Sequence, residues 1–126
     1  MEFVYQDLSY KINGVLFEVY NELGPGLKEN TYQRAIAVAL SHTGLKFKEQ
    51  VYFPLRFKNE VVGSLYFDFL IDEKIVLELK VGEYFSRRNI EQVHQYLLYS
   101  GLHLGLLANF TLHGVKIKRV VNLQNK

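Results

Sequence analysis

The sequence contains no cysteine and no tryptophan among its 126 residues. Without cysteine, disulfide bonds, thiolate metal sites and thiol nucleophiles are all excluded. The absence also fits a reducing compartment, so we expect a cytoplasmic protein. No apolar run approaches the roughly 18 residues that a membrane-spanning helix requires. Residues 1–7 lack the basic and apolar regions of a secretory signal, so none is expected.

The sequence also has little excess charge, with 13 acidic against 15 basic residues and a net charge of +2. That balance does not by itself indicate a nucleic-acid partner. A P-loop, a dinucleotide-binding fingerprint and a serine nucleophile elbow are absent, and the four histidines show no metal-ligand spacing. The length and the 48% hydrophobic content predict one globular domain over residues 1–126.

Apolar residues in steps of three and four predict three helices. The first covers residues 4–23 and ends at a Gly-Pro-Gly breaker, and the second ends near residues 42–44. Asn30 or Thr31 is the expected cap of the second helix, with Glu29 in its first turn as the alternative. The third helix covers residues 87–100, with Ser86 as its cap.

The remaining segments have the composition and alternation of strands. Pro54 places the first of them at a sheet edge or a bulge. The fourth is almost wholly apolar, as in a strand buried on both faces, and the last alternates with basic residues near an edge. The order ααβββαββ predicts an α/β (α+β) fold, a mixed sheet flanked by helices. The strands are expected at residues 51–57, 61–71, 75–81, 104–110 and 115–121.

Two acidic residues interrupt apolar strands. Asp68 lies within the second predicted strand and Glu78 within the third. A carboxylate in a sheet core is costly unless it is paired, protonated or bound to a metal. Strand alternation places Glu78 and Lys80 on one face, opposite the leucines beside them.

The turn between these strands decides whether the two acids meet. A three-residue loop at residues 72–74 pairs Ile71 with Ile75 and places Asp68 opposite Glu78. A two-residue loop instead places Phe67 opposite Glu78 and separates the acids, since a slip of one residue reverses every side chain. Two adjacent carboxylates repel each other unless a divalent cation lies between them. An ordinary ion-paired hairpin has the same Asp…Glu-x-Lys spacing.

Further motifs in the sequence match those of a known protein family. Residues 26–32 spell GxxExxY, and the match continues through Gln50, residues 67–68, 77–80, 92–97, 105–107, 109–110 and 117–119. The chain resembles the GxxExxY family, a bacterial family of the PD-(D/E)XK nuclease superfamily. The resemblance implies that superfamily's single-domain α-β-β-β-α-β core and a metal-dependent active site.

The resemblance also implies roles for the acidic motif. Asp68, Glu78 and the Leu79 carbonyl would ligate Mg²⁺ or Mn²⁺, and Lys80 would hold the attacking water or neutralise charge on the phosphate. Glu29 would bind a second metal or orient the lysine. A glutamate in the first turn of a helix also favours the helix dipole without any catalysis.

The third predicted helix carries a second motif. Gln92 and Tyr96 are four residues apart and share a helix face. Related nucleases use such a pair to orient the site and contact the DNA backbone, although Gln95 and Tyr99 have the same spacing. The alternative is that neither residue has a functional role, with the glutamine at the surface and the tyrosine packed in the core.

Nucleic-acid contact needs basic residues, each of which can also be ordinary solvated charge. The candidates are Arg87, Arg88, Lys116, Lys118 and Arg119. The predicted function is metal-dependent hydrolysis of phosphodiester bonds in nucleic acid, with DNA the expected substrate. A homodimer is compatible with a small nuclease, although nothing in the sequence indicates one. The alternatives are a catalytically idle module that binds nucleic acid or protein, and a subunit whose activity depends on a partner.

Overall fold

The structure, a computed structural model, describes residues 5–123. Within this range its elements follow the predicted order ααβββαββ. The predicted start of the first helix, at residue 4, lies outside the described residues. The elements are α1 (Gln6–Leu23), α2 (Glu29–Ser41), β1 (Phe47–Phe57), β2 (Glu60–Ile71), β3 (Ile75–Val81), α3 (Arg87–Ser100), β4 (Leu104–Thr111) and β5 (Gly114–Val121).

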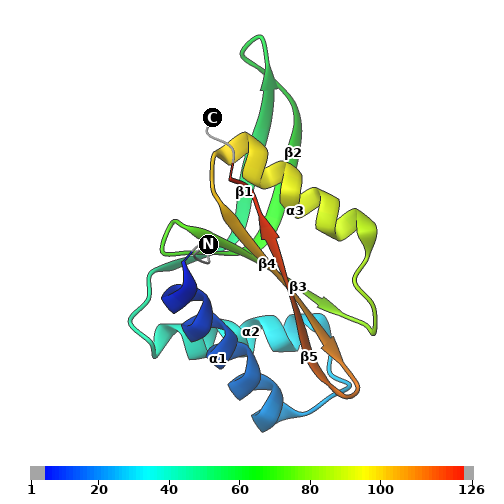
Figure 1. Cartoon of the computed structure of the whole chain (residues 1–126). Coiled ribbons are helices and arrows are strands. Elements are labelled where there is room, and N and C mark those ends of the chain that lie inside the picture. Colours follow the sequence, from blue (N-terminus) through cyan, green and yellow to red (C-terminus); the bar gives the residue numbers. More distant parts are fainter. Residues whose placement is uncertain (1–4, 124–126) are drawn as a thin grey trace.

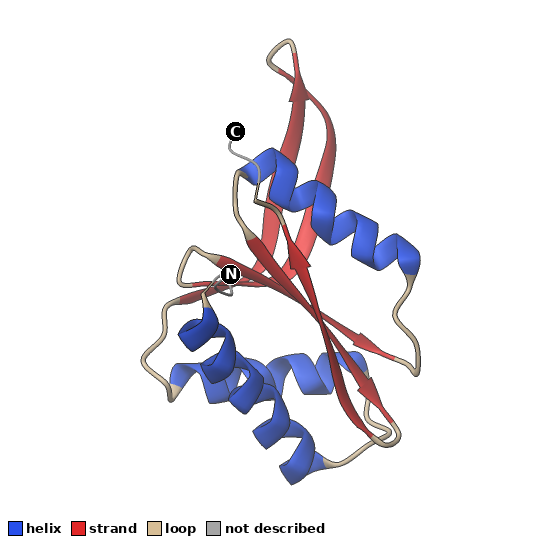
Figure 2. Cartoon of the chain, viewed as in Figure 1, coloured by secondary structure: helices blue, strands red, loops and turns tan. Residues whose placement is uncertain are grey.

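The strands form one mixed sheet in the order β1-β2-β3-β4-β5. β3 and β4 are parallel, and the other neighbours are antiparallel. Figure 1 shows α1 and α2 together on one side of the sheet and α3 on the other. The strands twist strongly between these layers (Figure 2). No helix within residues 5–123 is both long and apolar enough to cross a membrane.

The sheet separates two apolar clusters. The larger packs α1 and α2 against Phe69, Leu77, Leu79 and their neighbours, and the smaller packs α3 against Phe67 and Val76. β4 is buried along its whole length, as its apolar run predicts. Ser86 caps α3 as expected, because its hydroxyl accepts a hydrogen bond from the Asn89 N–H at 3.3 Å.

The start of α2 follows the alternative in which Glu29 lies in the first turn of the helix. The helix begins at Glu29 after Lys28, so neither Asn30 nor Thr31 is its cap. Tyr32 fixes this turn instead: its hydroxyl donates to the Gly24 carbonyl at 2.6 Å and accepts from the Leu27 N–H at 3.2 Å. The motif at residues 26–32 therefore holds the entry to α2 in place, which fixes the position of Glu29.

β2 changes face at Asp68. Phe69 and Ile71 pack in the cluster beneath α1 and α2, whereas Leu65 and Phe67 pack beneath α3. Alternation along a regular strand would keep all four on one face. The β2–β3 pairing ends at Phe69, and the β1–β2 register omits residues 50 and 68. Asp68 therefore lies just beyond the last β2–β3 pair. Figure 1 shows the outer part of the β1–β2 hairpin leaving the rest of the sheet.

Gly105 lies on the α3 side of β4 and has no room for a side chain. A Cβ there would lie 2.4 Å from Cγ1 of Val93 and 3.0 Å from Cγ1 of Val76. We expect Gly105→Ala to lower the free energy of unfolding by about 2 kcal/mol through overpacking, measured by urea denaturation. Gly14→Ala is the control, because its Cβ meets nothing within 4 Å. Equal stability of Gly105→Ala and the wild type would contradict this account of the α3 packing.

Candidate active site

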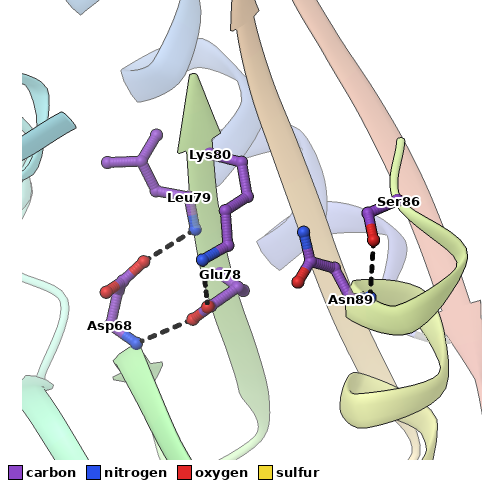
Figure 3. A network of polar contacts seen from close by, with 6 residues as sticks. All are labelled: Asp68, Glu78, Leu79, Lys80, Ser86 and Asn89. Atoms are coloured by element: carbon purple, nitrogen blue, oxygen red, sulfur yellow. Dashed lines mark hydrogen bonds and ion pairs between the residues drawn. The ribbon is translucent and has the colours of Figure 1, made fainter. Parts of the chain in front are cut away.

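The side chains of Asp68 and Glu78 bridge the gap where β2 leaves β3 (Figure 3). The Asp68 N–H donates to Oε1 of Glu78 at 3.2 Å. The Leu79 N–H donates to Oδ2 of Asp68 at 2.8 Å. Nζ of Lys80 lies 3.5 Å from Oε2 of Glu78. Carboxylates thus replace the backbone pairing of β2 with β3, which holds both acids in fixed positions.

The three-residue turn that this meeting requires is present. Ile71 pairs with Ile75, and the register continues to Phe69 and Leu77. The prediction that Asp68 and Glu78 meet is therefore confirmed, and the two-residue alternative is wrong. Glu78 and Lys80 share the face toward α3 with Val76, while Leu77 and Leu79 are buried on the other face, as strand alternation predicts.

Both carboxyl groups are strongly affected by their surroundings. The pKa of Glu78 is raised to about 7, mainly by burial and also by the Asp68 carboxylate, while the Lys80 ammonium opposes both. Burial also raises the pKa of Asp68, against the hydrogen bond from Leu79. The Asp68 carboxylate therefore disfavours the ionised form of Glu78 in a poorly solvated gap.

Glu29 also reaches this region. Its carboxylate is close enough to contribute to the raised pKa of Asp68, and it is half-buried at the first position of α2. The Leu79 carbonyl faces the same gap as the Leu79 N–H, because the two backbone groups of one strand residue point to the same side. The structure thus brings together Asp68, Glu78, Lys80 and the Leu79 backbone, while Glu29 lies near enough to act on Asp68 through its charge.

Metal-ligating side chains are sparse both at this site and in the rest of the described residues. Among residues 5–123 no group of three or more His, Asp or Glu side chains is close enough together to hold a metal ion by itself. Any cation at this site would therefore use the two carboxylates with backbone and water oxygens, which is the donor set that Mg²⁺ usually keeps.

A family model described as the PD-(D/E)XK nuclease superfamily matches residues 6–120. The chain belongs to this superfamily. The order and spacing of Asp68, Glu78 and Lys80 fit the D…(D/E)-x-K pattern in that name. Membership of the GxxExxY family within it stays a prediction.

Other comparisons bear on the fold of this PD-(D/E)XK protein. A solved structure named "Crystal structure of SSO0001" matches with a TM-score of 0.51 and 11% sequence identity, over 94% of this chain and 79% of that chain. At that identity the likeness shows the fold alone. A comparison with curated proteins found no significant match.

The motif on α3 is divided between the surface and the core of this PD-(D/E)XK domain. Gln92 lines a polar cavity of about 370 Å³ between α3 and the outer part of β2, together with Arg88 and Gln95. Tyr96 is only 3% exposed, and its ring packs on Phe67 with centroids 4.5 Å apart. A ring covered in this way has no open face for a base, so Tyr96 has only its hydroxyl to offer a ligand.

The predicted basic residues do not form one surface. Lys116 and Lys118 pair with Asn109 and Leu107 of β4 and lie on the α3 side of the sheet. Arg119 lies on the other side and donates to the Ser9 hydroxyl of α1 at 3.1 Å. Arg87 is exposed and ion-paired with Glu91, and Arg88 lines the α3 cavity. Of these five predicted residues, only Arg119 is on the face of the sheet away from Lys80.

Two further residues at the site had no assigned role in the sequence. Gln50 stands opposite Asp68 and has a φ of 50°, a left-handed conformation that nothing in its sequence indicates. Asn109 pairs with Lys80 and is 3% exposed. The sequence does mark Asn109, because its amide interrupts the apolar run of residues 104–110.

Proposed function

We propose that this protein is a Mg²⁺- or Mn²⁺-dependent nuclease that hydrolyses phosphodiester bonds of DNA. One observation carries the proposal: in a member of the PD-(D/E)XK superfamily, Asp68, Glu78 and Lys80 converge in the gap between β2 and β3. The fold alone does not identify an activity, but this arrangement has the components for metal-assisted hydrolysis.

The donor set fits a hard divalent cation. Glu78 is buried and Asp68 half-buried, burial raises the pKa of both carboxyls, and Glu29 adds a further acid near a single lysine. Such an excess of negative charge is stabilised by a cation with oxygen ligands. Asp68, Glu78 and the Leu79 carbonyl would hold it, with Glu29 within reach of the same region.

The chain's own residues then have separate tasks. A divalent cation supplies the positive charge that makes water more acidic and stabilises charge on phosphate. The hydrogen bonds from the backbone of Asp68 and Leu79 keep the two carboxylates in place. Lys80 is a third exposed at its side chain, so its ammonium can reach a phosphate oxygen and oppose the charge that develops during attack.

A cleavage assay with a panel of nucleic acids tests the proposal. The purified protein is incubated with supercoiled plasmid, linear duplex, single-stranded DNA and RNA of matching sequence, in Mg²⁺, Mn²⁺ or EDTA. We expect cleavage of DNA with either metal and none in EDTA. Binding without cleavage in every metal would support the idle module instead. Neither binding nor cleavage would support the partner-dependent subunit, and light scattering of the same sample tests for a homodimer.

The separation of Lys118 from Arg119 gives a prediction about DNA binding. Because Lys118 lies on the same side of the sheet as Lys80, Lys118→Gln should reduce the slope of log Kd against log salt by about one unit. Arg119→Gln removes the same charge from the opposite face and should leave the slope unchanged. Fluorescence anisotropy over a salt series measures both. Equal loss in the two variants would show that DNA does not follow the α3 side.

A further inference from the structure

Asn109 is a buried amide beside the candidate site. It lies on β4, where the register places it next to Lys80 of β3 on one side and Lys116 of β5 on the other. These three residues alternate onto the α3 side of the sheet, the face that carries Glu78. At 3% exposure, Asn109 has almost no contact with solvent.

The orientation of the Asn109 amide is fixed by its own hydrogen bonds. Nδ2 donates to the Gly82 carbonyl at 3.3 Å and to the Tyr84 carbonyl at 2.7 Å. Only the NH₂ group of an amide can donate to two carbonyls. The amide atom facing Gly82 and Tyr84 is therefore Nδ2, and the atom pointing away from them is Oδ1. The bonds tie the β3–α3 loop to β4 and hold the side chain rigidly.

Oδ1 of Asn109 has no hydrogen-bond partner among the described residues, although it is fully buried. A buried acceptor without a donor costs roughly 1–3 kcal/mol, and such groups are rare in native proteins. Its presence next to a lysine therefore needs an explanation.

The register supplies two candidate donors for this oxygen. Nζ of Lys116 already donates to the Glu83 carbonyl at 3.1 Å. Nζ of Lys80 is 3.5 Å from Oε2 of Glu78, longer than a well-formed charged hydrogen bond. Lys80 is thus the donor whose present contact is the weaker.

We propose that Oδ1 of Asn109 is the second acceptor for the Lys80 ammonium, used when Glu78 is engaged by a cation. This inference rests on the proposed nuclease function and makes Asn109 a positioning residue that acts through Lys80. When the oxygens of Glu78 are taken, Lys80 loses its partner, and its flexible four-carbon stem is otherwise free to move into solvent. Asn109 keeps the ammonium beside the carboxylates, where a phosphate would bind.

The first test needs no metal and no activity. Glu78→Ala removes the partner of Lys80 and leaves Asn109 unchanged, so it imitates the engagement of Glu78. In a crystal structure of this variant we expect Nζ of Lys80 within about 3 Å of Oδ1 of Asn109. A Lys80 side chain extended into solvent, with Oδ1 still unpartnered, would overturn the proposal.

The second test separates positioning from stability. Asn109→Ala should lower kcat for Mn²⁺-dependent cleavage by roughly 10- to 100-fold while KM for DNA stays the same. Asn122→Ala is the matched control, because Asn122 is also buried and its Nδ2 also donates to two carbonyls, those of Leu97 and Leu102. That control should lose stability without losing kcat. A kcat that falls equally in both variants would assign Asn109 a structural role only.

The two tests distinguish the inference from the function on which it rests. A wild type that cleaves DNA, with a Glu78→Ala structure in which Lys80 avoids Asn109, overturns the inference and leaves the nuclease in place. A wild type that never cleaves, with the Lys80–Asn109 hydrogen bond present in Glu78→Ala, overturns the nuclease and leaves the contact.

Discussion

Asp68→Asn is expected to reduce Mn²⁺-dependent DNA cleavage by at least about a thousandfold. The substitution keeps the shape of the side chain and an oxygen that can accept from the Leu79 N–H, so the β2–β3 gap should retain its form. It removes the negative charge that would hold a cation. The reaction is followed by the loss of supercoiled plasmid, and circular dichroism checks that the variant is folded.

Asp72→Asn is the matched control for this loss. Asp72 lies in the β2–β3 turn, only four residues away, and is paired with Lys74 at 3.7 Å. The same chemical change there should leave cleavage within about twofold, because a surface ion pair contributes little. Mn²⁺ should also raise the melting temperature of the wild type and of Asp72→Asn, but not of Asp68→Asn. Wild-type cleavage by Asp68→Asn would show that the chemistry occurs elsewhere.

The hairpin that carries Asp68 and Glu78 was predictable because its determinants are local. Three turn residues set the pairing of Ile71 with Ile75, and alternation then places Glu78 and Lys80 on one face. The cost of a carboxylate in an apolar strand marked both acids as unusual without any structure. The meeting of Asp68 and Glu78 and the order of the surrounding elements could therefore be predicted from the sequence.

The point where β2 leaves the sheet was not predictable from the same reasoning. Alternation assumes a regular strand, whereas Phe67 and Phe69 face different layers on either side of Asp68. The opposing Gln50 has a left-handed φ, which most sequences would signal with glycine or asparagine. This irregularity depends on contacts with α3 and α2 together, so it belongs to tertiary packing.

The positions of Tyr96 and Arg119 show a second limit of prediction from sequence periodicity. Helix periodicity places Gln92 and Tyr96 on one face, but it does not say how deep each residue lies, and Tyr96 is covered by Phe53 and Phe67. Arg119 is adjacent to Lys118, and alternation alone already sends them to opposite faces. Adjacent basic residues on a strand are therefore poor evidence for one binding surface.

Glu78→Gln should stabilise the metal-free protein at alkaline pH. An acid whose pKa rises from 4.5 to about 7 on folding binds its proton more tightly in the native state than in the unfolded state. Its contribution to stability is therefore fully present below pH 4.5 and is lost as the pH rises through about 7. Glutamine cannot ionise, so the variant should exceed the wild type by roughly 3 kcal/mol at pH 8.5 and differ little at pH 4.5, as measured by urea denaturation in EDTA.

The physical reason for that gain is the position of Glu78. Its side chain is only 12% exposed and lies against Asp68, so ionisation at alkaline pH places a second negative charge in the gap, with Lys80 as its partner. Glu73→Gln is the control, since Glu73 is exposed in the adjacent turn and its change should shift the stability by less than about 0.5 kcal/mol at either pH. A difference between Glu78→Gln and the wild type that is the same at both pH values would mean that Glu78 ionises normally. The gap between β2 and β3 would then be well solvated, and its carboxylates would not need a cation to offset their charge.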